Sequence, residues 1–129
     1  TLRHDHDGVT FTVASGGHPL PVVVTANGAH TVGHPGTLLG VFGEISTRCD
    51  TIHLSSGDVL VLYTDGATDV SPPHRLTAEQ FTELVHRAVT RNPELTADTV
   101  ADRIHQELEQ VLTFDQRDDD IAILILRIT

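Results

Sequence analysis

The sequence predicts an α+β domain made of mostly antiparallel strands and two helices. Residues 58–64 and 121–126 are short apolar runs of the kind that form buried strands. Between them, residues 77–112 carry apolar side chains at helical spacing. Strands, then two helices, then one strand is the order of an α+β layered fold, and nothing in the chain indicates an internal repeat or a linker to a second domain.

The N-terminal third predicts short strands joined by turns. Residues 9–15 alternate large apolar and small polar side chains, and residues 21–25 follow a Gly-Gly-His-Pro turn, so we expect these two strands to form a hairpin. Asn27-Gly28 is a strong turn signal before a weak strand at 30–32, because both residues tolerate a positive φ. The expected arrangement of this part is a β-meander.

The second half predicts two further strands, two helices and a last strand. Residues 50–54 and 58–64 are strand candidates separated by Ser55-Ser56-Gly57. Residues 58–64 and 121–126 are apolar on both faces, which predicts central strands covered on both sides. The helices are indicated by a capping box at 77–80 and a cap at Thr96, and the second should end near Leu112. Their apolar stripes are Phe81, Leu84, Val85 and Ala88, then Val100, Ile104, Leu108 and Val111.

Composition narrows the function classes. At 129 residues the chain fits one domain, and it has no apolar run long enough to cross a bilayer. Acidic residues outnumber basic ones 18 to 8, and the formal charge of -10 repels nucleic-acid phosphates and anionic membrane surfaces. Cys49 is the single cysteine, so no internal disulfide can form, and we interpret it as a structural thiol in a reducing cytoplasm.

Carboxylates follow one predicted buried strand and precede the other. Asp65 comes directly after strand 58–64 and before Gly66, and Asp118-Asp119-Asp120 stands at the start of strand 121–126. If the two strands are neighbours in the sheet, these carboxylates can converge. Like charges held close together raise each other's pKa, so an ionised cluster calls for a divalent cation such as Mg²⁺ or Mn²⁺. The alternative is that Asp65 caps a turn and the three aspartates form a solvated loop.

Three sequence blocks resemble bacterial PPM-type metal-dependent serine/threonine phosphatases of the stage II sporulation protein E-like subfamily. The longest is Gly57-Asp58-Val59-Leu60-Val61-Leu62-Tyr63-Thr64-Asp65-Gly66-Ala67-Thr68-Asp69. The others are the Gly17-His18-Pro19 turn and the closing Asp119-Asp120-Ile121-Ala122-Ile123-Leu124 strand. The resemblance implies a β-sandwich of two stacked sheets with flanking helices, and a two-metal centre at one end of it. In that family the metals activate a water that attacks the phosphorus without a covalent enzyme intermediate.

The resemblance also implies roles for single residues. Asp65 and Asp119 match metal ligands of the family, which binds two Mg²⁺ or Mn²⁺ ions. Asp118 and Gly66 are candidates for the outer shell of the metal centre. No substrate-binding residue is assigned, and no catalytic residue beyond the metal ligands. The implied substrate is a protein phosphorylated on serine or threonine, an anti-sigma-factor antagonist in a partner-switching pathway.

Three further polar residues in or beside these blocks, His18, Asp69 and Asp120, are not expected to bind metal or to act as catalysts. His18 is expected to shape the Gly17-His18-Pro19 turn rather than to act as an acid or base. Asp69 stands where relatives usually carry glutamate, and we expect it to make a local hydrogen bond. Asp120 is one step along a strand from Asp119 and should point the other way.

The sequence departs from the family pattern at its start. The family's first metal-binding blocks have no counterpart here, so residues 1–129 are expected to be one partial phosphatase domain, its C-terminal part, with the N-terminal half absent. That half normally supplies the aspartate that bridges both metals. We therefore expect an incomplete metal site in the isolated chain, whose own activity is uncertain, and association with a second copy or with the missing half.

Three other interpretations compete with this one. Haloacid dehalogenase-like phosphatases also use an Asp-Gly-Thr-like block, but Tyr63 occupies the place of their nucleophilic aspartate. A truncated or degenerate phosphatase module could serve as a non-catalytic regulatory or binding domain, although it would not need both Asp65 and Asp119. His4 and His6 could form a metal pair, but no third ligand is evident nearby, which favours a solvated terminus.

Overall fold

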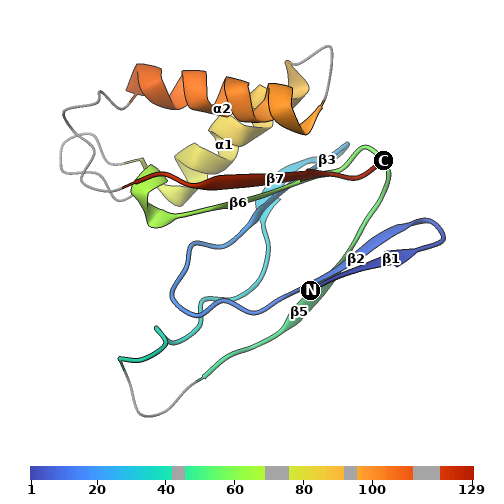
Figure 1. Ribbon diagram of the computed structural model, residues 1–129, viewed down its shortest axis with the longest axis vertical. Helices are drawn as coiled ribbons and strands as arrows, with labels where there is room; N and C mark the ends of the chain where they lie inside the picture. The colour runs from blue at the N-terminus through green and yellow to red at the C-terminus, as the bar shows by residue number, and fades with distance from the viewer. Residues whose placement is uncertain (42–45, 69–75, 92–95, 112–119) are drawn as a thin grey trace.

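The computed structural model describes residues 1–41, 46–68, 76–91, 96–111 and 120–129, which form two antiparallel sheets and two α-helices (Figure 1). In these residues the strand order is β1-β2-β5 in one sheet and β4-β3-β6-β7 in the other. The α+β class is therefore confirmed. The elements are β1 (Leu2–Asp5), β2 (Gly8–Val13), β3 (Val22–Thr25), β4 (Gly28–Thr31), β5 (Asp50–Leu54), β6 (Val59–Tyr63), the 3-10 turn η1 (Asp65–Ala67), α1 (Ala78–Thr90), α2 (Ala97–Val111) and β7 (Ile123–Arg127).

Two apolar cores hold three layers together. The helices cover one face of the four-stranded sheet, and the three-stranded sheet faces its other side (Figure 1). Strand β6 contributes to both cores, because Val59 and Val61 pack with the helices while Leu60 packs toward the other sheet. All three are fully buried, which confirms the prediction of a central strand covered on both sides. Burial of each such side chain contributes about 1.5 to 3 kcal/mol to stability.

The predicted hairpin between the first two strand candidates is wrong. Strand β2 pairs with β1 and β5, whereas β3 belongs to the other sheet and pairs with β4 and β6. The segment between β2 and β3 therefore crosses from one sheet to the other, and the β-meander is replaced by two hairpins, β1-β2 and β3-β4. Gly17 in this crossing has φ +90, and a Cβ there would lie 2.3 Å from a methyl group of Leu38. Both the positive φ and the short distance to Leu38 therefore exclude a side chain at this position.

The last strand is less covered than its sequence predicts. Strand β7 pairs with β6 and has no second neighbour among the described residues. Ile123 and Ile125 pack toward the helices, but Leu124, which points the other way, is 60% exposed. The expectation that residues 121–126 are covered on both sides is therefore wrong at Leu124, although Leu126 on the same face packs against the core between the two sheets.

The helices agree with their sequence signals. The capping box of α1 is present: Thr77 Oγ1 accepts from the Gln80 amide at 3.2 Å, and Gln80 Oε1 accepts from the Thr77 amide at 2.9 Å. Helix α2 ends at Val111, and the expected end near Leu112 lies outside the described residues. No helix in the described ranges has the length and apolar character needed to cross a bilayer. Cys49 is exposed, so its interpretation as a structural thiol is wrong.

Candidate metal centre

Asp65 stands where the buried strand β6 turns sharply. Directly after β6, the Ala67 amide donates to the Thr64 carbonyl at 3.1 Å, and the Thr68 amide donates to the Asp65 carbonyl at 2.8 Å. These bonds close the single turn η1. Gly66 and Ala67 are buried beneath it, while Asp65 remains exposed. The turn therefore holds a carboxylate at the surface on a backbone anchored in the core.

Thr64 links this turn to the start of the last strand. Its amide donates to the Ala122 carbonyl at 3.1 Å, and the Ala122 amide donates to its Oγ1 at 3.0 Å. Its hydroxyl also lies 3.3 Å from the Asp120 carbonyl, to which it donates. Strands β6 and β7 are antiparallel neighbours, so the condition for bringing Asp65 near the aspartate run is met. Thr64 was missed by the sequence reasoning, although its place between a buried strand and Asp-Gly was visible.

Tyr63 anchors the end of β6 from below. The centroid of its ring lies 4.1 Å from the ring centroid of Phe81 in α1, and the two ring planes are inclined by 32°. Burial raises the pKa of the Tyr63 phenol, and the negative charge of Glu79 raises that pKa further. The ring therefore stays neutral at physiological pH, and the strand end that carries Asp65 rests on a packed aromatic pair.

Only part of the predicted ligand set can be placed. Asp65 and Gly66 are described, whereas Asp119 and Asp118 lie outside the described residues, as does Asp69. Asp120, the sequence neighbour of Asp119, is exposed next to Thr64. The roles of Asp65 and Asp119 as ligands, and of Asp118 and Gly66 in the outer shell, therefore stay predictions.

His18 lies in the crossing between the sheets. Its carbonyl accepts a 2.8 Å hydrogen bond from Ser15 Oγ, while its imidazole belongs to an exposed residue. The same loop lines a cavity of about 240 Å³ together with Leu62 and Tyr63. These contacts place the backbone of the Gly17-His18-Pro19 turn against the end of β6 that carries Asp65.

The described residues offer the right kind of ligand for a hard divalent cation, but too few of these ligands to hold one. Carboxylate oxygens are the donors that Mg²⁺ and Mn²⁺ prefer, and the Asp65 carboxylate makes no ion pair with another described residue. Within the described ranges, no three His, Cys, Asp or Glu side chains converge. Completing a site at Asp65 thus requires ligands beyond those described, and the predicted one, Asp119, directly precedes Asp120 in the sequence.

Comparison with known proteins gives one family and several solved structures. The family described as stage II sporulation protein E matches residues 1–129. No curated protein matches the chain. The phosphatase domain of SpoIIE from Bacillus subtilis, presoaked with manganese, is similar with a TM-score of 0.70 and 16% identity over 98% of this chain and 54% of that chain.

Two other solved structures are similar. One contains the RsbU and RsbW domains of a Mycobacterium tuberculosis protein, with a TM-score of 0.64 and 27% identity over 94% of this chain and 34% of that chain. The other is the catalytic domain of the serine/threonine protein phosphatase PstP in complex with two manganese ions, with a TM-score of 0.60 and 12% identity over 98% of this chain and 56% of that chain. The chain thus spans 34% to 56% of the length of these three structures.

Proposed function

The chain belongs to the stage II sporulation protein E family, and from this premise we propose that residues 1–129 are the C-terminal part of a metal-dependent serine/threonine protein phosphatase domain. The observation that carries the proposal is the pairing of β6 with β7. Thr64, which directly precedes Asp65, hydrogen-bonds to Asp120 and Ala122 at the approach to β7. The family match and the phosphatase folds of the similar structures support the same conclusion.

In this proposal Asp65 and Asp119 hold Mg²⁺ or Mn²⁺. Two such ions, when bound, lower the pKa of a water and neutralise charge on the phosphoryl group being transferred. The chain's own contribution is placement: η1 keeps the Asp65 carboxylate exposed, and Thr64 fixes the spacing between that turn and the segment leading into β7. The solved structure of PstP with two manganese ions supports the choice of metal.

The proposed substrate is a protein phosphorylated on serine or threonine. By resemblance we identify it as an anti-sigma-factor antagonist, dephosphorylated in the cytoplasm within a partner-switching pathway. Support comes from the Mycobacterium tuberculosis structure, in which RsbU and RsbW domains occur together. The formal charge of -10 favours a protein substrate over nucleic acid.

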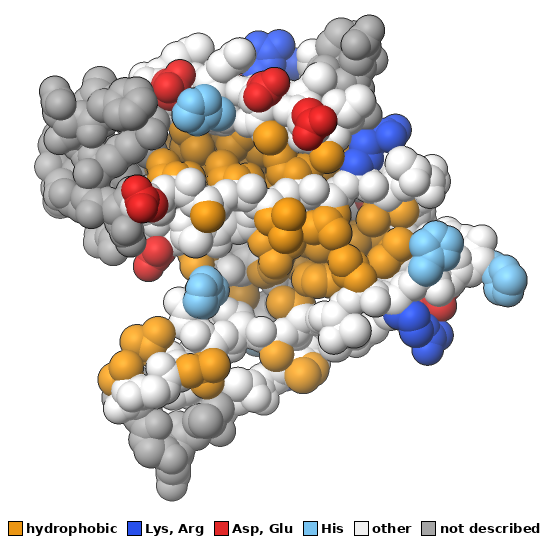
Figure 2. Space-filling model, viewed as in Figure 1, with side chains coloured by type: hydrophobic (Ala, Val, Ile, Leu, Met, Phe, Trp, Pro, Cys, Tyr) orange, Lys and Arg blue, Asp and Glu red, His pale blue; other side chains and the backbone are white. Residues whose placement is uncertain are grey.

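We propose further that the rest of a phosphatase domain, or a second copy, covers an apolar face of this chain. Leu124 on β7 and Leu2 on β1 are 60% and 44% exposed, and a cavity of about 370 Å³ lies between those two edge strands. Figure 2 shows apolar side chains gathered in the hollow between the helix-bearing layer and the three-stranded sheet. The similar structures are longer than this chain, which supports covering by additional domain residues.

The test is hydrolysis of para-nitrophenyl phosphate by the purified chain with Mn²⁺ and with a chelator. Hydrolysis is expected where self-association of the chain completes the metal site, and it should be chelator-sensitive, lost in Asp119→Asn and kept in Asp102→Asn, a charge removal on the exposed surface of α2. Absence of hydrolysis would overturn the claim that this chain is itself an enzyme and would favour a non-catalytic regulatory module or a catalytic half that needs the remaining ligands.

A further inference from the structure

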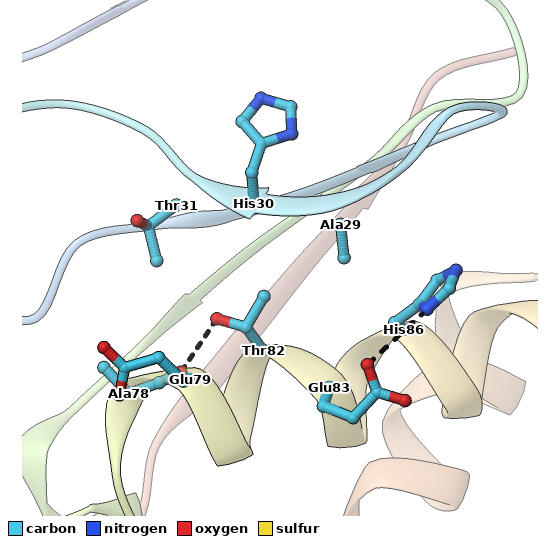
Figure 3. A pocket seen from close by; sticks show the side chains of 8 residues that line it. All are labelled: Ala29, His30, Thr31, Ala78, Glu79, Thr82, Glu83 and His86. Atoms are coloured by element: carbon cyan, nitrogen blue, oxygen red, sulfur yellow. Dashed lines mark hydrogen bonds and ion pairs between the residues drawn. The ribbon is translucent and has the colours of Figure 1, made fainter.

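A groove between β4 and α1 is lined by residues that take no part in the candidate metal centre. Its volume is about 410 Å³, and its walls come from β4 and from residues 78–86 of α1. In Figure 3 the side chains of Ala29 and Thr31 point toward α1, while His30 points away from it. Glu79, Thr82 and Glu83 form the helix side of the groove.

The strand side of this groove is an open sheet edge. Within the described part of the chain, β4 pairs with β3 alone. The Val32 amide donates to the Pro21 carbonyl at 2.9 Å, and the register places Thr31 opposite Val22. Because hydrogen-bonded pairs alternate along an antiparallel ladder, the backbone N–H and C=O groups of Ala29 and Thr31 point away from β3. This edge can pair with one more extended strand.

The helix side of the groove is acidic. Glu79 and Glu83 are both exposed and lie one helical turn apart. Among the described residues no lysine or arginine lines the groove, although His86, which does, lies 3.9 Å from Glu83. Hydrogen bonds from its own backbone amide and from the Thr77 hydroxyl hold the pKa of Glu79 below its usual value, so this carboxylate stays ionised. Glu83 lies 3.9 Å from Arg87, whose guanidinium also bonds Glu107 at 3.1 Å. A strand that pairs with β4 would therefore meet negative charge.

We propose that this groove binds an extended basic segment of a partner protein, which adds to the β4 edge and directs lysine or arginine side chains at Glu79 and Glu83. A second copy of the chain fits less well, because its own β4 would bring another pair of glutamates into the groove, and like charges repel. The site is independent of the proposed phosphatase activity, since it uses no residue of the metal centre.

The test is binding of a fluorescently labelled, end-blocked peptide of alternating lysine and valine, followed by anisotropy. The expected result is binding that weakens as salt rises, because exposed charge contacts are screened. Each lost charge contact at the surface should weaken binding about threefold, so the double variant Glu79→Gln/Glu83→Gln should bind about tenfold more weakly. The matched control is Asp98→Asn/Asp102→Asn on α2, which removes the same charge outside the groove and should leave binding unchanged.

Strand pairing is tested separately from charge. Ala29→Pro removes an outward amide of β4, and a peptide N-methylated at alternate backbone amides removes the pairing groups without altering the protein; both should abolish binding. In the NMR spectrum, the amide signals of Ala29 and Thr31 should shift on titration with the unmodified peptide. The proposal would be overturned if the N-methylated peptide bound as tightly as the unmodified one, or if binding did not depend on salt. It would also be overturned if the unaltered chain bound no peptide and Ala29→Pro changed only its oligomeric state.

Discussion

Thr64 and Ala122 bond to each other in both directions across β6 and the approach to β7. The Thr64 amide donates to the Ala122 carbonyl at 3.1 Å, and the Ala122 amide donates to Thr64 Oγ1 at 3.0 Å. The same hydroxyl donates to the Asp120 carbonyl. One side chain therefore sets the separation between the turn that holds Asp65 and the residues from Asp120 to Ala122 that lead into β7.

Replacing Thr64 tests this link. Thr64→Val keeps the shape of the side chain but removes both of its hydrogen bonds, so the free energy of unfolding should fall by about 1 to 2 kcal/mol. Urea denaturation followed by circular dichroism measures the change. Thr64→Ser retains the hydroxyl and should keep most of the stability. Equal denaturation midpoints for Thr64→Val and the unaltered chain would contradict the link.

The raised pKa of Tyr63 predicts that the free energy of unfolding falls at alkaline pH. Burial and the charge of Glu79 raise its folded-state pKa above the unfolded value of 10.0, so the unfolded chain releases the phenolic proton first. The resulting stabilisation is fully present below pH 10.0 and is lost as pH rises through the folded-state pKa. Because Tyr63 is the single tyrosine, phenolate absorbance reports it directly. Tyr63→Phe should lose less stability over the same range, and a phenolate titration at or below the unfolded value would contradict the account.

The capping box makes a local prediction for α1. Thr77→Ala removes the acceptor for the Gln80 amide and should lower the free energy of unfolding by about 1 kcal/mol. Thr77→Ser keeps the acceptor and serves as the control. Thermal unfolding followed by circular dichroism distinguishes the two, and a stability of Thr77→Ala equal to that of Thr77→Ser would show that the cap contributes nothing.

The exposed face of β7 predicts association of the chain. Leu124→Asp places a charge on this face and should weaken self-association about tenfold or more, since burial of one leucine contributes about 1.5 to 3 kcal/mol. Val111→Asp is the control, because Val111 is 44% exposed but lies at the end of α2. Size exclusion with light scattering measures both variants. A clean monomer of the unaltered chain at all concentrations would contradict the expectation.

The elements best predicted from sequence are those whose local pattern agrees with their packing. Strand β6 is apolar on both faces and is buried on both, and the capping box of α1 needs only four neighbouring residues. The pairing of β2 could not be predicted in the same way. Alternation along residues 9–13 shows that a strand exists, but it does not say which strand lies beside it, and the nearest candidate in sequence belongs to the other sheet.

Strand β1 was missed for a related reason. Leu2–Asp5 is largely exposed and polar, so it carries no hydrophobic period and forms a strand because β2 lies beside it. Asp65 was accessible to sequence reasoning because a carboxylate after a buried strand and before glycine is a local pattern. The preceding residue, Thr64, bonds across the sheet to Ala122, 58 residues away in sequence, and no local pattern predicts that pairing.

The most direct measurement of the central claim is Mn²⁺ titration of the isotopically labelled chain followed by NMR. The paramagnetic ion broadens signals of nearby nuclei, so the account predicts selective broadening of amides at residues 64–66 and 118–122. The effect should be absent in Asp65→Asn and unchanged in Asp102→Asn. Broadening spread evenly over the acidic surface, or equal in Asp65→Asn and the unaltered chain, would contradict the assignment of Asp65 as a metal ligand.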